Sequence, residues 1–181
     1  MRCIHVILLA LVFARPVAAC ETALLLAVDV SGSISLEEYR LQMEGLADAL
    51  EDPRVMAALV DGQNRLALVQ WSGSRHQRLA LPWTSVTTPE DVAAVAAGVR
   101  AIRRPQLRTV TAIGEAIRFS LDQFPDASDC ARKVIDISGD GAENEGMTLT
   151  AARAEAITAG VTINAIAIEE QAFAARRRLH G

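Results

Sequence analysis

In Ala23-Leu24-Leu25-Leu26-Ala27-Val28-Asp29-Val30-Ser31-Gly32-Ser33, an apolar run passes directly into a polar loop. The apolar run at 23–28 predicts a buried β-strand. One carboxylate (Asp29) and two hydroxyls (Ser31 and Ser33) then follow at alternate positions, so oxygen ligands gather at one end of the strand. Hard cations such as Mg²⁺ select ligands of this type. The stretch therefore predicts a buried strand that ends in part of a cation site.

Predicted helices and strands alternate along the rest of the chain. Ser35 and Glu38 form a capping-box pattern that predicts one helix start, and Thr88-Pro89 predicts another. Apolar residues recur at helical spacing after both signals. The predicted strands are 23–28, 65–71, 77–83, 133–138 and 161–168, and the predicted helices are 36–50, 53–60, 89–102, 113–124 and 149–159.

This order of elements predicts one α/β domain of the doubly wound type. Strands that alternate with helices form parallel βαβ units, which place helices on both faces of the sheet. The short connection at 72–76 instead favours an antiparallel pair of strands 65–71 and 77–83. We therefore expect a mostly parallel, Rossmann-like sheet with one antiparallel edge strand.

Two further segments should deliver oxygen ligands to the same edge of the sheet. The strand at 133–138 ends in Gly139-Asp140-Gly141, and Thr111 opens the helix that follows. In open α/β sheets, ligands bind outside the carboxyl ends of the strands. Each residue alone could instead serve a turn or a helix cap. Together they predict a metal site made of Asp29, Ser31, Ser33, Thr111 and Asp140.

The first nineteen residues have the pattern of a secretory signal peptide. Arg2 precedes an apolar segment at 4–13, and small residues at 17–19 follow it. We expect the domain at 20–170 and a basic tail at 171–181, and no other segment is long and apolar enough for a transmembrane helix. Without residues 1–19 the chain has 16 basic and 22 acidic side chains, a net charge of −6, which argues against nonspecific nucleic-acid binding.

Two cysteines, Cys20 and Cys130, remain after removal of the signal peptide. Cys20 lies nine residues before Asp29 and Cys130 lies ten before Asp140, so neighbouring parallel strands would bring them almost level. Strand spacing and a one-residue offset place their Cα atoms roughly 6 Å apart, which suits a disulfide. Val17-Ala18-Ala19-Cys20 also resembles a lipoprotein cleavage box, in which Cys20 would carry a lipid anchor and Cys130 would be free.

The three-part motif resembles the metal-ion-dependent adhesion site (MIDAS) of von Willebrand factor type A (vWA) domains, as found in exported, uncharacterised bacterial members. It consists of Asp29-x-Ser31-x-Ser33, Thr111 in Thr-Ala-Ile-Gly-Glu-Ala-Ile, and Asp140 in Ile-Ser-Gly-Asp-Gly. The resemblance implies direct metal ligation by Ser31, Ser33 and Thr111, with Asp29 and Asp140 acting directly or through water. It implies Mg²⁺, with Mn²⁺ or Ca²⁺ as alternatives, and a protein partner whose Asp or Glu completes the shell. It also implies a periplasmic or secreted location.

The chain departs from the vWA pattern at two places. Asp140 follows Ser138-Gly139, whereas many members have Thr-Asp-Gly. Thirteen residues follow Ile168, whereas the family usually adds a further strand and a terminal helix. Either the final strand and helix are lacking through truncation, or the strand at 161–168 is an exposed edge that needs a cover.

Arginines near Thr111 suggest a rim for an acidic partner. The predicted partner-binding rim consists of Arg103, Arg104, Arg108 and Asn144. Positive charge beside a metal would favour association with an acidic loop. The alternative is a solvated helix end whose arginines complement the helix dipole.

These observations predict a non-catalytic, metal-dependent protein-binding domain. Catalysis would need a general base or nucleophile besides the metal, and the pattern indicates none. One alternative is a Mg²⁺-dependent phosphohydrolase, although Ser31 stands where aspartyl-phosphate enzymes of the haloacid dehalogenase type have a second Asp. The other is a structural envelope protein, lipid-anchored through Cys20.

Overall fold

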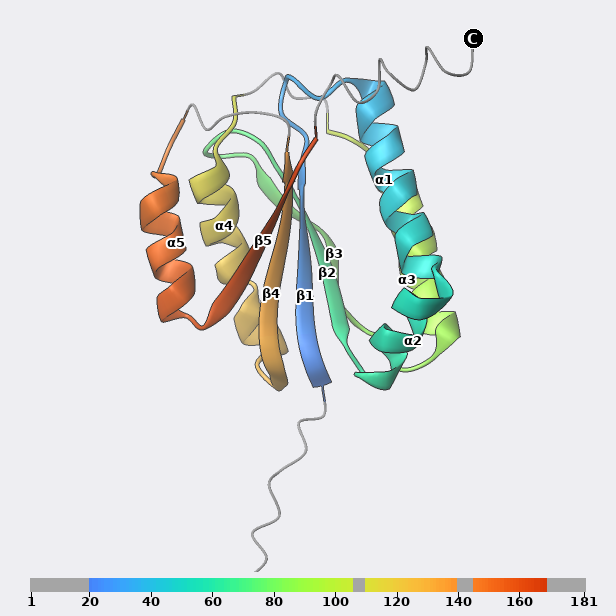
Figure 1. The fold of residues 1–181 in the computed structure, drawn as a ribbon. Helices are drawn as coiled ribbons and strands as arrows, with labels where there is room; N and C mark the ends of the chain where they lie inside the picture. Colours follow the sequence, from blue (N-terminus) through green and yellow to red (C-terminus); the bar gives the residue numbers. More distant parts are fainter. Residues whose placement is uncertain (1–19, 106–109, 140–144, 169–181) are drawn as a thin grey trace, which may run out of the picture.

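The computed structural model describes residues 20–105, 110–139 and 145–168, which form a five-stranded sheet between two layers of helices (Figure 1). The predicted signal peptide and tail lie outside the described residues. The strand order is β3-β2-β1-β4-β5. Neighbouring strands are parallel except β2 and β3, which are antiparallel, as predicted. The strands are β1 (Cys20–Asp29), β2 (Arg65–Trp71), β3 (Gln77–Ser85), β4 (Cys130–Gly139) and β5 (Val161–Ala167).

Helices cover both faces of the sheet, as the α/β alternation predicts (Figure 1). One layer contains α1 (Leu36–Glu51), α2 (Pro53–Asp61) and α3 (Pro89–Ala101), and the other contains α4 (Ile113–Leu121) and α5 (Leu149–Thr158). Two separate apolar cores result, one on each face. Leu26 and Val28 of β1 pack into the α1–α3 core, and Leu25 and Ala27 pack into the α4–α5 core. The unbroken apolar run of β1 reflects this burial on both faces.

Capping signals set most helix starts, but α4 ends earlier than predicted. The Ser35–Glu38 capping box is present at α1, and Thr88 forms a second box with Asp91 at α3. α4 ends at Leu121 instead of continuing to Phe124. A 3₁₀ turn, Phe124–Ala127, follows because Pro125 lacks the N–H that a continuing helix needs. The N-cap of α4 is Ala112, which makes no side-chain cap bond, so Thr111 is not the cap of α4.

A disulfide joins the starts of β1 and β4. Cys20 and Cys130 are bonded, with their Cα atoms 4.4 Å apart. The predicted one-residue offset is wrong, because Cys20 pairs directly with Cys130 in the parallel ladder. The prediction assumed that Asp29 and Asp140 end their strands at the same level. In the structure Val28 pairs with Ser138, so the strand residue that follows at the level of Asp29 is Gly139, the last residue of β4. The bond supports the disulfide alternative for Cys20.

The described helices include no candidate membrane span: none is both long enough and apolar enough to cross a bilayer.

Candidate metal centre

The loop that leaves β1 folds back on its own aspartate. Asp29 is the last residue of β1, and its Oδ1 accepts a hydrogen bond from the Ser31 backbone N–H at 2.7 Å. The Val30 N–H donates to the Trp71 carbonyl at 2.8 Å, which fixes the loop against the end of β2. Ser31 Oγ and Ser33 Oγ lie 3.1 Å apart. Asp29 and Ser31 are fully buried. One carboxylate and two hydroxyls thus meet in a small, ordered loop at the carboxyl edge of the sheet.

Thr111 reaches the same edge from a different segment. It is buried, with 4% of its surface exposed. The next residue, Ala112, donates its N–H to the Ser72 carbonyl at 3.0 Å, directly after the end of β2. Because Thr111 does not cap α4, the helix-cap alternative does not explain its position.

Asp140, Arg108 and Asn144 lie outside the described residues, but Gly139 shows where the β4 loop begins. A Cβ on Gly139 would lie 3.0 Å from Asp29 Oδ2 and 3.3 Å from Trp71 Cζ2. A side chain at 139 would therefore crowd the buried carboxylate. The backbone of β4 passes Asp29 this closely because position 139 is glycine, which gives a physical reason for the Ser-Gly-Asp-Gly departure. Asp140 is attached directly to this point.

Two glutamates hold the segment that follows the β4 loop. Glu115 of α4 accepts a hydrogen bond from the Met147 N–H at 2.7 Å. Glu145 accepts one from the Ser74 N–H at 2.8 Å, in the turn between β2 and β3. Gly146 has a φ of +91°, and any Cβ there would collide with the Glu115 carboxylate. Glu115 lies within the Thr111 motif, but the sequence pattern predicted no role for it.

Arg104 binds the β1 loop through its backbone. The Arg104 guanidinium donates to the Ser31 carbonyl at 2.8 Å, with the Val30 carbonyl at 3.5 Å. Its side chain is half-buried, whereas Arg103 is exposed. Arg104 belongs to the predicted partner-binding rim, and its hydrogen bonds go to the loop at residues 29–33, the metal loop. Partner binding by Arg103 and Arg104 stays a prediction.

A buried hydrogen-bond network fixes the segment that carries Arg104. Gln70 of β2 donates to the Tyr39 hydroxyl at 2.7 Å and to the Arg103 carbonyl at 3.3 Å. Tyr39 in turn donates to the Ile102 carbonyl at 3.0 Å. Burial raises the pKa of the Tyr39 phenol, so it stays a neutral donor. Arg78 donates to Gln70 Oε1 at 2.6 Å. The network ties α1, β2 and β3 to the residues just before Arg104.

The side chains present fit a hard divalent cation. The predicted ligands that the structure describes are one carboxylate and three hydroxyls, all oxygen donors. Ser72, beside Ala112, has a fully buried hydroxyl with no hydrogen-bond partner among the described residues. A buried polar atom of this kind points to a ligand or water. Within the described ranges no three His, Cys, Asp or Glu side chains gather, so a nitrogen- and sulfur-rich site is not indicated there.

An open recess borders the metal loop. Its lining includes Gly32 of the loop and Val110, next to Thr111, and its other walls are the β2–β3 turn and Glu145. Arg75 supplies a positive charge to this lining. A partner segment could therefore approach the metal loop from the side of the β2–β3 turn.

A family model described as "Protein of unknown function (DUF1194)" matches residues 19–181. No curated protein matches the chain in sequence.

Similar solved structures share the fold. Proximal thread matrix protein 1 from the mussel byssus has a TM-score of 0.67 and 20% identity, over 82% of this chain and 38% of that protein. A second structure of it, with a zinc-occupied MIDAS motif, has a TM-score of 0.65 and 19% identity, over 82% and 38%. A von Willebrand factor type A protein from Catenulispora acidiphila has a TM-score of 0.58 and 17% identity, over 81% and 33%. The chain thus has the Rossmann-like vWA fold and spans less than two fifths of these proteins.

Proposed function

The chain belongs to the DUF1194 family of proteins of unknown function, and from its vWA fold and its metal loop we propose that it is an exported, metal-dependent protein-binding domain. The observation that carries the proposal is the β1 loop, where two serine hydroxyls lie 3.1 Å apart beside a fully buried aspartate. A mussel vWA-fold structure has its MIDAS occupied by zinc, which supports divalent-metal binding at the corresponding edge.

In this proposal five residues hold the ion: Asp29, Ser31, Ser33, Thr111 and Asp140. An ion bound there would act as a Lewis acid toward a carboxylate of a protein partner. The two protein carboxylates would balance the charge of Mg²⁺, and five protein ligands would leave one position of its octahedral shell for that carboxylate. Mn²⁺ and Ca²⁺ are the alternative metals.

We propose binding rather than catalysis because Asp29 is committed within its own loop. Its Oδ1 accepts the Ser31 N–H, and the residue is fully buried. A nucleophilic aspartate of a phosphohydrolase must reach a substrate phosphorus, which this side chain is poorly placed to do. Ser31 also stands where such an enzyme would have its second aspartate.

The surroundings of the site favour an acidic partner. Arg75 lines the recess beside Gly32, where the carboxylate of Glu145 is engaged by the Ser74 N–H, and Arg103 is exposed next to Arg104. Basic side chains around a cation add to its attraction for a carboxylate-rich segment and speed the encounter at low salt. The Cys20–Cys130 disulfide supports export, because disulfides persist in oxidising compartments.

The test is a titration of Mg²⁺, Mn²⁺ and Zn²⁺ into the mature protein by calorimetry. Ser33→Ala and Asp29→Ala should weaken or abolish metal binding. Ser35→Ala is the matched control, because its hydroxyl caps α1 through the Glu38 N–H and is not a proposed ligand. Phosphatase activity is assayed on the same samples.

The absence of metal binding in the unaltered protein would defeat the proposal. Equal loss of affinity in Ser33→Ala and Ser35→Ala would do the same, because it would indicate a general effect on the loop. Metal-dependent phosphate release that disappears in Asp29→Ala would instead establish the phosphohydrolase.

A further inference from the structure

A pocket of about 510 Å³ lies where the end of α3 meets β3. Its lining consists of Arg78 and Ala80 of β3, Gly98 and Ala101 of α3, and residues 102–105 of the segment that follows α3. Arg78, Arg103 and Arg104 belong to this lining, and no acidic side chain does so among the described residues. Pockets of this size hold small molecules. We call it the arginine pocket, and its charge suits an anion.

The three arginines have no acidic partner in the described part of the chain. None of the ion pairs between described residues includes Arg78, Arg103 or Arg104. Arg100, one turn earlier on α3, differs from them because it pairs with three carboxylates of α1. The Nε of Arg104 is buried and has no hydrogen-bond partner within the described ranges. Positive charge therefore accumulates in the arginine pocket without neutralisation.

Neutral side chains satisfy the carbonyls at the end of α3. The Tyr39 hydroxyl donates to the Ile102 carbonyl at 3.0 Å, and the Gln70 amide donates to the Arg103 carbonyl at 3.3 Å. Arginines that served only the end of the helix would cap these carbonyls themselves. The Arg103 side chain is instead exposed. The arginine side chains are thus available to a ligand.

Two of the arginines are held close to one buried phenol. Burial raises the pKa of Tyr39, whereas the Gln70 hydrogen bond and then the charges of Arg78 and Arg104 lower it. Arg78 Nη2 donates to Gln70 Oε1 at 2.6 Å, and Arg104 Nη2 donates to the Ser31 carbonyl at 2.8 Å. These bonds use one nitrogen of each guanidinium and leave other N–H groups for a ligand. A bound anion would offset the repulsion between the two charges.

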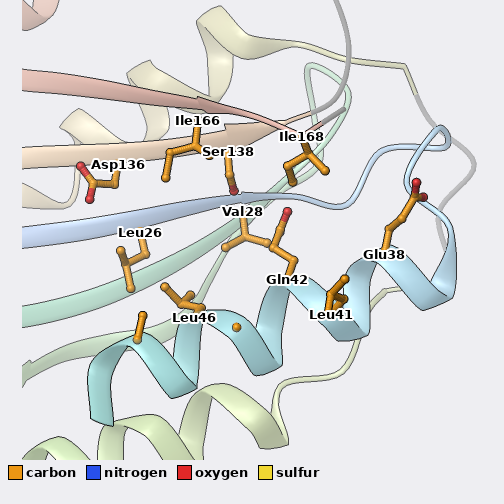
Figure 2. Close-up of a pocket in the computed structure, with 12 residues that line it drawn as sticks. Leu26, Val28, Glu38, Leu41, Gln42, Leu46, Asp136, Ser138, Ile166 and Ile168 are labelled. Carbon is orange, nitrogen blue, oxygen red and sulfur yellow. The ribbon is translucent and has the colours of Figure 1, made fainter. Parts of the chain in front are cut away.

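A second hollow of the molecule, the groove between α1 and the sheet, has the opposite charge. Figure 2 shows Glu38 and Asp136 among the apolar side chains of this groove. No Lys or Arg lines it among the described residues. An anion is therefore attracted to the arginine pocket and repelled from this groove.

We propose that the arginine pocket binds the phosphoryl group of a phosphomonoester. Such a group carries about two negative charges at neutral pH and has three oxygens that accept hydrogen bonds. Three guanidinium forks can each engage one of these oxygens. A carboxylate has one charge and two oxygens, so it would leave at least one arginine without a partner. The volume of the pocket also accommodates the esterified group. The proposal does not depend on the metal ligands.

Titration of inorganic phosphate into the metal-free protein at low ionic strength tests the site. Backbone amide resonances of Gly98, Ala101 and Ile102 should shift as phosphate binds, because these residues line the pocket. Arg103→Met should raise the dissociation constant at least about tenfold. Its fold should be preserved, because Gln70 bonds to the backbone carbonyl of this residue. Arg54→Met is the matched control: its side chain is 93% exposed and lies outside the pocket, so the constant should change less than about twofold.

Two further ligands distinguish the source of the phosphoryl group. Vesicles that contain phosphatidate should bind more tightly than glycerol phosphate if the natural ligand is a lipid headgroup. Glycerol phosphate should bind at least as tightly as the vesicles if the ligand is a soluble ester. In both cases Arg103→Met should remove the binding, and vesicles of phosphatidylcholine alone should not bind.

Three results would overturn the proposal. The first is the absence of amide shifts on addition of phosphate. The second is equal binding of acetate and phosphate, which would identify a carboxylate site. The third is loss of phosphate binding in Arg75→Met but not in Arg103→Met, which would place the anion in the recess beside the metal loop. A separate Mg²⁺ titration of the unaltered protein reports on the metal site, so failure of one proposal is distinguishable from failure of the other.

Discussion

Replacement of Arg104 by methionine should weaken metal binding, although it removes a positive charge from the vicinity of a cation. Methionine keeps the length of the aliphatic stem and deletes only the guanidinium. The hydrogen bond at 2.8 Å to the Ser31 carbonyl is lost, whereas the contact at 3.5 Å to Val30 is at the limit and adds little. A hydrogen bond from a charged donor contributes about 1.5–3 kcal/mol. If that stabilisation orders the loop that binds the metal, the dissociation constant for Mg²⁺ should rise about 10- to 150-fold.

The sign of the change separates two roles for Arg104. Simple charge repulsion predicts tighter metal binding once the guanidinium is removed, and positioning of the loop predicts weaker binding. Isothermal titration of Mg²⁺ into Arg104→Met and Arg103→Met measures the change in metal affinity caused by each substitution. Arg103 contributes to the network through its backbone carbonyl, which methionine retains, so its variant should change the affinity less than about twofold. Tighter or unaltered binding in Arg104→Met would refute the reasoning.

Three further outcomes follow from the geometry. Gly139→Ala should lower stability by about 1–3 kcal/mol and weaken metal binding, because the new Cβ would lie 3.0 Å from Asp29 Oδ2. Its control is Gly98→Ala in α3, whose Cβ would make an ordinary 3.5 Å contact with Leu81 of β3, and which should be neutral or stabilising in the same urea titration. Cys130→Ala should lower the free energy of unfolding by about 2–5 kcal/mol, and a urea midpoint equal to that of the oxidised protein would contradict this. Hydrogen bonds from Thr87 and Thr88, of which the one from the Thr87 backbone N–H has the largest effect, lower the pKa of Asp91 below its usual value of 3.8. The ionised Asp91 carboxylate therefore stabilises the fold fully above this usual value. That stabilisation is lost as the pH falls through the lower pKa of the folded state. Melting temperatures of the parent should therefore fall more between pH 5 and pH 2.5 than those of Asp91→Asn, and parallel curves would count against the contribution.

The order of elements could be read from the sequence because local signals and tertiary packing agree. The run at 23–28 is apolar on both faces, and β1 is buried on both faces. The capping box at Ser35 and the Thr88-Pro89 start signal placed α1 and α3 correctly, since both signals depend on residues close in sequence. The end of α4 was missed because Phe124 continues the helical spacing, although Pro125 ends the helix earlier.

The site could be predicted only as far as topology determines it. Parallel strands bring Asp29 and the end of β4 to one edge whatever the loops do. Arg104 binds a carbonyl 73 positions away in sequence, and no spacing pattern records a contact between a side chain and a distant backbone. The same holds for Glu115 with Met147 and for Glu145 with Ser74. The predicted register of the two cysteines differs by one residue from the observed level pairing. The reason is that the apolar pattern defines the middle of a strand but not the residue at which the strand ends.

The disulfide lies at the start of β1 and the metal loop at its end, which determines how the domain would carry tension. A partner that pulls on the metal loop, against a force applied at the start of β1, would load β1 along its length. The strand lies between β2 and β4 in parallel register, so its inter-strand hydrogen bonds would be sheared together rather than opened one by one. The bond from Cys20 to Cys130 would divide the load between two strands at the point where it enters. Because β1 is the central strand of the sheet, this arrangement would let the domain transmit force along β1 without unfolding from the start of the strand.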